Sequence, residues 1–165
     1  MSRLLKISVV FLLLFSLLTG CGLFQKTFTC QDLNITLPSG FKDYSDAEEA
    51  KNFDFLYLSD QVGIAGVRTQ KISLQSNNPN MTLEQFAQFV ADESGLEDAV
   101  ISQNDGIYNF TYELDTDQKS YTYLVAVFED DISFWALQCY SVSEDFSDVR
   151  DDIWEYLSTV TISDR

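Results

Sequence analysis

Carboxylates are the most numerous reactive side chains in this sequence, with 26 Asp and Glu residues against 10 Lys and Arg. Two short segments, Asp115-Thr116-Asp117 and Glu129-Asp130-Asp131, place them closely enough that their oxygens could hold Ca²⁺. The first segment lacks the Gly and the distal Glu of an EF-hand loop, and hairpin turns explain both segments better. A carboxylate pair could also hydrolyse a glycosidic bond, but nothing in the sequence marks such a pair.

Histidine is absent from the chain. Its absence removes the commonest general base near neutral pH and the commonest ligand of transition metals. The six Lys residues lie in polar or signal-like contexts, whereas a Ser–Lys dyad needs a desolvated amine. Gly63 and Gly66 form no phosphate-binding loop, because no Gly-Lys-Ser/Thr follows them. We therefore expect no catalytic residue, no metal site and no cofactor.

Cys21 is the residue with the best-defined chemistry. It closes the segment Leu18-Thr19-Gly20-Cys21, which resembles the bacterial lipobox. In that motif the small residues admit the backbone to a signal peptidase, and the Cys thiol accepts a diacylglycerol. The segment follows Arg3, Lys6 and an apolar run over residues 7–18. As a helix this run is about 18 Å long, too short for a bilayer core of about 30 Å, and it is typical of a secretion signal.

These features predict three parts of the chain. Residues 1–20 are expected to be a lipoprotein signal peptide, residues 21–26 a lipidated short spacer, and residues 27–165 a single domain. Two acyl chains on Cys21 would hold the protein stably on a membrane. We therefore expect a lipid-anchored protein of the bacterial cell membrane that faces outside the cytoplasm.

Cys30 and Cys139 would then lie on the oxidising side of that membrane, where disulfides persist. A bridge between them would close a long loop and contribute on the order of 4 kcal/mol to stability. The alternative is two buried free thiols that act as small apolar side chains, which the apolar strand pattern around Cys139 favours.

The charge of the chain limits its partners. Removal of residues 1–20 leaves eight basic residues against 26 acidic ones. Such a surface repels the phosphates of nucleic acid and the headgroups of anionic lipids, so the lipid on Cys21 must supply membrane binding. A basic protein or cations remain as partners, although the charge is also explained by solubility alone.

Alternation of apolar residues predicts strands over residues 27–37, 53–59, 62–74, 107–114, 121–128, 132–142 and 159–162. The first of these changes parity at Gln31-Asp32, which indicates a tight turn or bulge. Gly63 and Gly66 inside the third indicate bulges or close contacts.

Helices are expected at three places. Thr82 begins a capping box and a helix with an apolar stripe that Gly95 ends. A second helix carries apolar residues at helical spacing over residues 146–157, and Ser45 precedes either a short capped helix or an acidic loop.

Strands 121–128 and 132–142 are apolar on both faces, so the sheet must be covered on both faces. The predicted class is therefore α+β, with a mostly antiparallel sheet between layers of helices. Tyrosines Tyr108, Tyr112, Tyr121 and Tyr123 lie on neighbouring strands. They could form a ligand groove or partner patch, although packing of the core explains better why they recur at strand spacing.

Four segments in this order resemble the PsbP-like α/β/α sandwich, a family that includes bacterial lipoproteins of the DcrB type. They are the segment over residues 33–41, the Thr82-capped helix with Phe86, the long hairpin over residues 121–140, and the closing helix and strand around Ile153 and Val160. The resemblance implies a binding or assembly role without a shared active-site motif.

The leading hypothesis from the sequence is thus a non-catalytic module, anchored in the membrane, that binds an envelope protein. The alternatives are a small-ligand receptor that uses a cleft between sheet and helix, and a carboxylate-based hydrolase. A protein-binding module should expose an apolar patch, whereas a receptor should have a concave pocket with convergent polar groups.

Overall fold

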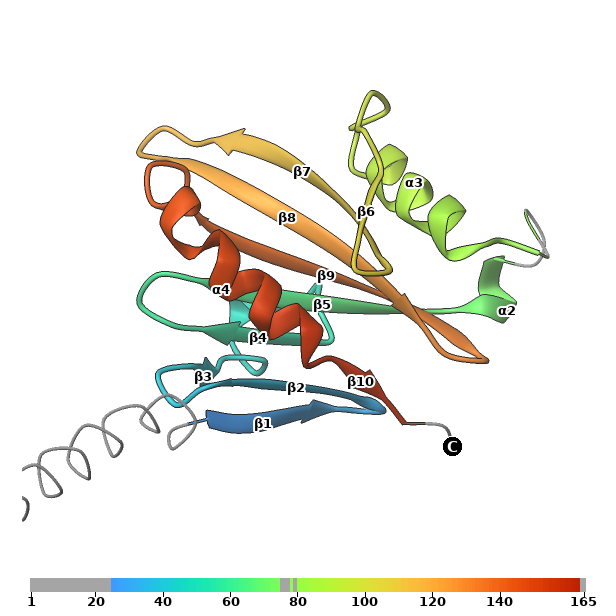
Figure 1. Cartoon of the computed structure of the whole chain (residues 1–165), viewed down its shortest axis with the longest axis horizontal. Coiled ribbons are helices and arrows are strands. Elements are labelled where there is room, and N and C mark those ends of the chain that lie inside the picture. Colours follow the sequence, from blue (N-terminus) through green and yellow to red (C-terminus); the bar gives the residue numbers. More distant parts are fainter. Residues whose placement is uncertain (1–24, 75–77, 79, 164–165) are drawn as a thin grey trace, which may run out of the picture.

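A seven-stranded antiparallel sheet forms the centre of the molecule in the computed structural model, which describes residues 25–74, 78 and 80–163 (Figure 1). Its strand order is β3-β4-β5-β9-β8-β7-β6. The strands are β3 (Lys42–Asp43), β4 (Phe55–Leu58), β5 (Gly63–Gln70), β6 (Ser102–Asn104), β7 (Ile107–Asp115), β8 (Ser120–Glu129) and β9 (Ser133–Val142). The long strands β8 and β9 lie in its middle, as their apolar sequences require.

A smaller antiparallel sheet lies beside the first, with the order β1-β2-β10. It consists of β1 (Gln25–Cys30), β2 (Leu33–Pro38) and β10 (Thr161–Ile162). Strands β1 and β2 are joined at Gln31-Asp32, where Gln31 adopts a φ of 56°, so the tight turn expected from the change of parity is confirmed.

Four helical segments complete the fold. They are the 3₁₀ helix η1 (Glu48–Ala50) and the α-helices α2 (Lys71–Leu74), α3 (Leu83–Glu93) and α4 (Phe146–Ser158). The capping box at Thr82 is present, with Thr82 accepting from the backbone of Gln85 and the Gln85 side chain accepting from the backbone N–H of Thr82. No helix among the described residues is long and apolar enough to cross a membrane.

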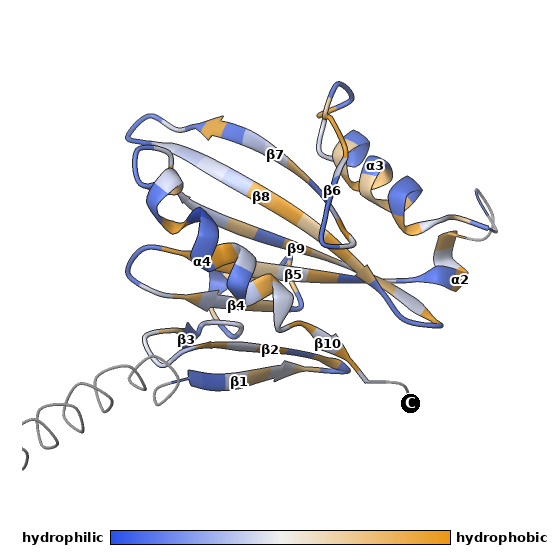
Figure 2. Ribbon diagram, in the orientation of Figure 1, coloured by the Kyte–Doolittle hydropathy of each residue, from blue (hydrophilic) through white to orange (hydrophobic). Residues whose placement is uncertain are grey.

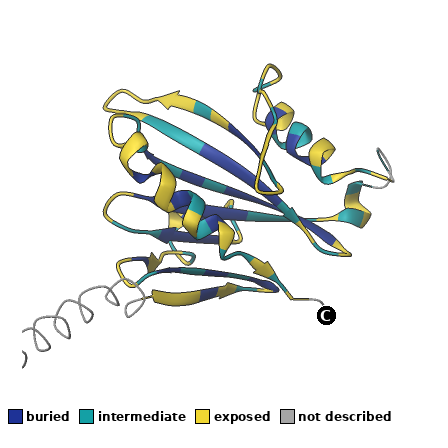
Figure 3. Cartoon of the chain, viewed as in Figure 1, coloured by how far each residue is buried: buried dark blue, intermediate teal, exposed yellow. Residues whose placement is uncertain are grey.

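Both faces of the large sheet are covered, which confirms the predicted α+β class. On one face, α4 and β2 enclose the main core with Leu124, Trp135 and Leu137. On the other, α3 packs against Val127 and Phe134. The layer on the first face therefore consists of α4 together with the small sheet. The alternation of apolar residues within single strands did not predict that the small sheet belongs to this layer. Figures 2 and 3 show the apolar and buried residues concentrated in the middle of β8 and β9.

Two local predictions need correction, and two short strands were not predicted. The strand expected over residues 62–74 ends at Gln70, and α2 follows. Ser45 does not cap a helix: its hydroxyl donates to Asp43 Oδ1 and accepts the N–H of Leu56, while η1 begins after Ala47. The short strands β3 and β6 were not predicted, because two or three exposed polar residues carry no alternation.

Arg68 links the two sheets through a buried network of charges. Its guanidinium donates to Asp32 Oδ2 at 2.6 Å, to Gln31 Oε1 at 3.0 Å and to Ser133 Oγ at 3.0 Å. Asp130, in the turn between β8 and β9, lies 4.0 Å from the same guanidinium. The network joins the β1–β2 turn to β5 and to the β8–β9 turn, so it positions the small sheet against the large one.

Candidate functional site

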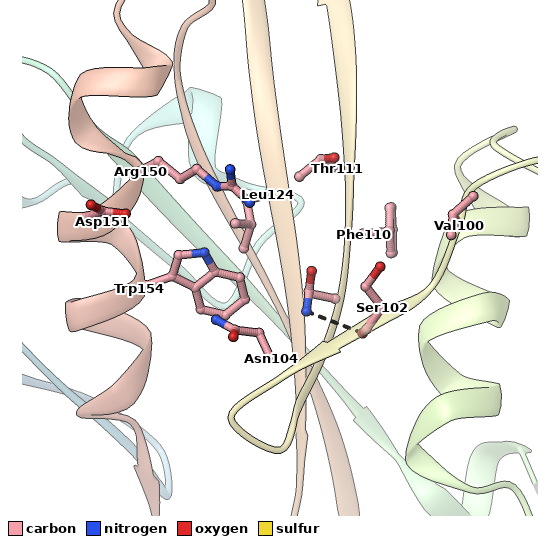
Figure 4. Close-up of a pocket in the computed structure, with 10 residues that line it drawn as sticks. Val100, Ser102, Asn104, Phe110, Thr111, Leu124, Arg150, Asp151 and Trp154 are labelled. Carbon is pink, nitrogen blue, oxygen red and sulfur yellow. Dashed lines mark hydrogen bonds between the residues drawn. The ribbon is translucent and has the colours of Figure 1, made fainter.

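A groove of about 430 Å³ lies between α4 and the hairpin formed by β6 and β7 (Figure 4). We call it the α4 groove. Its lining residues are Val100, Ser102, Asn104, Asn109, Phe110, Thr111, Leu124, Arg150, Asp151 and Trp154. The volume falls within the range of small-molecule sites. Polar groups from the hairpin face an arginine and a tryptophan from the helix across it (Figure 4).

The hairpin wall of the α4 groove is held by its turn and by one buried amide. Asp105 and Gly106 have φ values of 49° and 86°, as a two-residue turn of the kind found in tight hairpins requires. Asn109 is buried, and its Nδ2 donates to the carbonyls of Ile107 at 3.0 Å and Ser102 at 3.3 Å. These bonds fix β6 against β7, so Ser102 and Asn104 are presented from a rigid edge.

The helix wall is built by residues at a spacing of four. Arg150 and Trp154 lie one turn apart on α4, beside the stripe of Val149, Ile153 and Leu157 that is buried in the core. Their side chains therefore leave the helix at the margin of the core and extend toward the strands (Figure 4). Asp151 lies on the adjacent face of the helix and does not extend across the groove.

The opposite face of the sheet carries a second feature, a row of stacked tyrosines. Tyr112 pairs with Tyr123, and Tyr123 pairs with Tyr140 across β7, β8 and β9. Their ring centroids are 4.7 Å and 5.2 Å apart, and both pairs are stacked. We call these three residues the tyrosine row. Tyr121 meets Tyr140 edge to face at 6.4 Å and extends the aromatic surface.

The tyrosine row continues onto β5 at Gly63, which pairs with Tyr140. A Cβ at position 63 would lie 2.2 Å from Tyr140 Cζ, so only glycine lets the ring lie over β5. The close contact expected at this glycine is thereby confirmed, and Gly66 makes a similar one beneath Phe55.

Helix α3 covers the same face only at the other end of these strands, over Phe110, Val125 and Val127. The three rings of the row are half-buried, and Leu114, two residues beyond Tyr112 on that face, is 48% exposed. The loops at this end of the sheet carry Asp60, Asp117 and Glu144. The surface is therefore apolar and aromatic with an acidic margin.

The phenols of the tyrosine row are not acid–base groups near neutral pH. Burial, with a smaller contribution from Tyr123, raises the pKa of Tyr112 to about 12. Burial also raises the pKa of Tyr123 and of Tyr140 above the ordinary value for tyrosine. The rings remain uncharged, so they can offer stacking, cation–π contacts and hydrogen bonds.

The structure thus brings together three of the four tyrosines that the sequence places on neighbouring strands. Tyr108 is separate, because it packs under α3 with Phe86 and Phe134. Tyr140 was missed, since alternation on its own strand gives no sign of which strand lies beside it. Arg150 was missed too, although its spacing of four from Trp154 could have indicated a shared face.

The cysteines lie apart from both surfaces. Cys21 falls outside the described residues. Cys30 and Cys139 are free thiols, so the bridge between them, one of the two alternatives, is not formed in the structure. Burial raises the pKa of Cys139 to about 12, and burial followed by nearby carboxylates such as Asp54 raises the pKa of Cys30. Both sulfurs are therefore protonated and poorly nucleophilic at neutral pH.

The two acidic segments are turns between strands. Thr116 closes the β7–β8 turn by accepting from Lys119 N, and Asp130 closes the β8–β9 turn by accepting from the backbone N–H groups of Ile132 and Ser133. Within the described ranges, no group of three His, Cys, Asp or Glu side chains is placed to hold a metal ion.

Comparison with solved structures places this arrangement among known folds. CyanoP, the cyanobacterial PsbP of Synechocystis sp. PCC 6803, superposes with a TM-score of 0.55 at 13% identity, over 87% of this chain and 96% of CyanoP. The chain has a PsbP-like fold. The identity is low enough that the likeness concerns the fold alone.

Two further structures share the PsbP-like arrangement. LpqN, a protein involved in cell envelope biogenesis of Mycobacterium tuberculosis, gives a TM-score of 0.52 at 11% identity, over 85% of this chain and 91% of LpqN. A protein from Bacteroides thetaiotaomicron VPI-5482 gives 0.57 at 9% identity; 86% of this chain matches 49% of that one, so the chain spans about half its length. No protein-family model and no curated protein sequence matches the chain.

Proposed function

We propose that this protein is a lipid-anchored, non-catalytic module outside the cytoplasm that binds a basic protein of the cell envelope through the tyrosine row. Three considerations support the proposal. The segment ending at Cys21 has the residue types of a lipobox. The PsbP-like fold is shared with LpqN, an envelope protein. The absence of histidine from the sequence removes the commonest catalytic base.

The single observation that carries the binding role is the half-covered face of the sheet. Helix α3 protects only one end of β7, β8 and β9, and the other end presents Tyr112, Tyr123 and Tyr140 as one stacked surface. Tyrosine is enriched in protein interfaces because it combines a large apolar ring with a polar tip. A stacked row adjoining Leu114 has the composition of an interface centre.

The negative charge beside the tyrosine row favours a partner with a basic surface. The loops beside the row are acidic, and lysine or arginine side chains bind well over aromatic rings next to carboxylates. A partner with a basic face would be attracted by the net charge of the domain and then held by the rings.

The proposal is tested by crosslinking the lipidated protein in native membranes and identifying captured proteins by mass spectrometry. Tyr123→Ser removes the centre of the row, and Tyr44→Ser, at an exposed tyrosine elsewhere, is the matched control. We expect one or two basic envelope proteins whose capture is lost with Tyr123→Ser, is weakened by added salt and is retained with Tyr44→Ser. Capture that is unaffected by Tyr123→Ser, with circular dichroism showing a folded variant, would refute the role of the row.

The anchor is tested separately with Cys21→Ser. We expect this change to move the protein from the membrane fraction to the soluble fraction, because it removes the thiol that accepts the lipid. Retention on washed membranes at the wild-type level would show that Cys21 is not the anchor.

A further inference from the structure

The α4 groove presents one arginine without a charged partner. The positions three and four residues from Arg150 on α4 are uncharged, since residues 146, 147, 153 and 154 are Phe, Ser, Ile and Trp. The carboxylates of the helix lie on the face away from the core, at Asp148, Asp151, Asp152 and Glu155. Among the described residues, Arg150 takes part in no salt bridge, whereas Arg68 and Lys71 each have acidic partners.

An unpaired arginine is notable in a chain with 26 acidic residues. Asp151 is the single carboxylate among the described residues that line the groove, and it does not extend across the groove (Figure 4). The side chain of Arg150 extends toward the strands, whose polar side chains in the groove are neutral: Ser102, Asn104, Asn109 and Thr111. Such a space favours a negatively charged group opposite the arginine.

Apolar side chains from α4 and β8 adjoin Arg150 in the groove. Trp154 is half-buried beside Arg150, and the buried side chain of Leu124 forms the floor on the same face of the sheet, whereas the ring of Phe110 lies under α3 on the opposite face. A flat apolar group could lie against the indole while hydrogen-bonding groups from β6 and β7 remain available at the rim.

We propose that the α4 groove binds a small molecule that carries one carboxylate and a flat apolar part. Arg150 binds the carboxylate in a two-point hydrogen bond, and Trp154 contacts the apolar part. A carboxylate is favoured over a phosphate because the groove offers one cation, which neutralises a single negative charge. This site is on the opposite face of the sheet from the tyrosine row and does not depend on the proposed function.

Benzoate is a suitable probe, with benzamide as its uncharged counterpart and inorganic phosphate as a dianion. The mature lipidated chain in detergent micelles would be titrated at constant ionic strength while tryptophan fluorescence is recorded. The chain has two tryptophans, Trp135 and Trp154. Trp135→Phe isolates the signal of Trp154 and removes a buried indole N–H that has no hydrogen-bond partner. A parallel titration of the wild-type chain serves if that variant is unstable, since Trp135 is buried and its signal should not change.

We expect benzoate to give a saturable change and Arg150→Gln to weaken its binding by at least about tenfold, the value of one charge-assisted hydrogen bond. Lys42→Gln, which removes an exposed positive charge on β3 outside the groove, should alter binding by no more than about twofold. Benzamide and phosphate should bind at least about tenfold more weakly than benzoate. The proposal is overturned if benzoate gives no saturable change, if benzamide or phosphate binds as tightly, or if Arg150→Gln binds benzoate as well as the wild type does.

Discussion

The ring of Tyr140 lies directly over Gly63 on the neighbouring strand, where a Cβ would come within 2.2 Å of Tyr140 Cζ. This contact lets the ring lie flat across β9 and β5, and Tyr123 and Tyr112 stack upon it in turn. Because Gly63 on β5 has no Cβ, the tyrosine rings of β7, β8 and β9 can form one continuous aromatic surface.

Gly63→Ala should therefore disturb the tyrosine row. We expect the added methyl group to displace the Tyr140 ring and to lower the free energy of unfolding by about 1–3 kcal/mol, as in other overpacked sites. Urea unfolding followed by circular dichroism measures the change. Gly40→Ala is the control, because no atom lies within 4 Å of a Cβ at that position. Equal stability of the two variants would show that the Tyr140 ring does not need Gly63.

Replacement of Arg68 should destabilise the protein, because this residue links the two sheets. Arg68→Met leaves the buried carboxylate of Asp32 without its 2.6 Å partner, and Asp32 Oδ1 already has no hydrogen-bond partner. We expect a loss of about 3–5 kcal/mol in the free energy of unfolding. The double variant with Asp32→Asn should recover part of this loss, because the uncompensated charge is removed. Additive losses in the double variant would contradict a direct coupling between the two residues.

Asp130 should contribute to sensitivity to acid. Burial acts to raise the pKa of Asp130, but hydrogen bonds from Ile132 and Ser133 and the charge of Arg68 together lower it below 3.8. A carboxyl group with a lowered pKa in the folded state stabilises the protein above its unfolded pKa, and this contribution is lost as the pH falls through the folded value.

The free energy of unfolding of the wild type should therefore fall more steeply than that of Asp130→Asn as the pH decreases from roughly 5 to 3. The asparagine cannot titrate, although its Oδ1 can still accept the backbone hydrogen bonds. Asp131→Asn, at an exposed neighbour, controls for the loss of one negative charge. Parallel pH profiles for the wild type and Asp130→Asn would rule out this role.

Cys30 and Cys139 should be found as thiols in the folded protein. Cys139 is enclosed in the core, and Cys30 directs its Sγ to the carbonyl oxygen of Asp54 at 3.4 Å. We expect both to resist alkylation at neutral pH in the folded state and to react after unfolding, because burial disfavours their thiolates. Intact mass without reductant provides the check. A mass lower by two hydrogen atoms than that of the reduced protein would show that they are bridged.

Much of the fold could be predicted because it depends on local patterns. The capping box at Thr82 satisfies its own backbone groups, and the turn at Gln31-Asp32 follows from a change of parity within one segment. Strands β8 and β9 are apolar on both faces, so each face must be covered by another layer. The pattern does not say whether that layer is helix or sheet. The placement of Tyr112, Tyr121 and Tyr123 on neighbouring strands was predictable for the same reason, since β7 and β8 are consecutive strands of a hairpin.

The sites could be predicted only in part, because their residues come from elements distant in the chain. Strand β9 pairs with β5 across more than 60 residues, so the register that sets Tyr140 over Gly63 is a tertiary property. The α4 groove is formed by β6, β7 and α4. Strand β6 could not be predicted from the sequence, because it contains no apolar residue.

By itself, the sequence determined the acidic charge, the lack of histidine, the lipobox-like segment at Cys21 and the α+β class, because each depends on composition or on short spacings. The tertiary structure alone decided that a small sheet shares one covering layer with α4, that Arg68 joins the two sheets, and that Arg150 faces a groove without a carboxylate partner. The physical reason is that burial and pairing depend on which distant surfaces meet, and this depends on the packing of the whole chain.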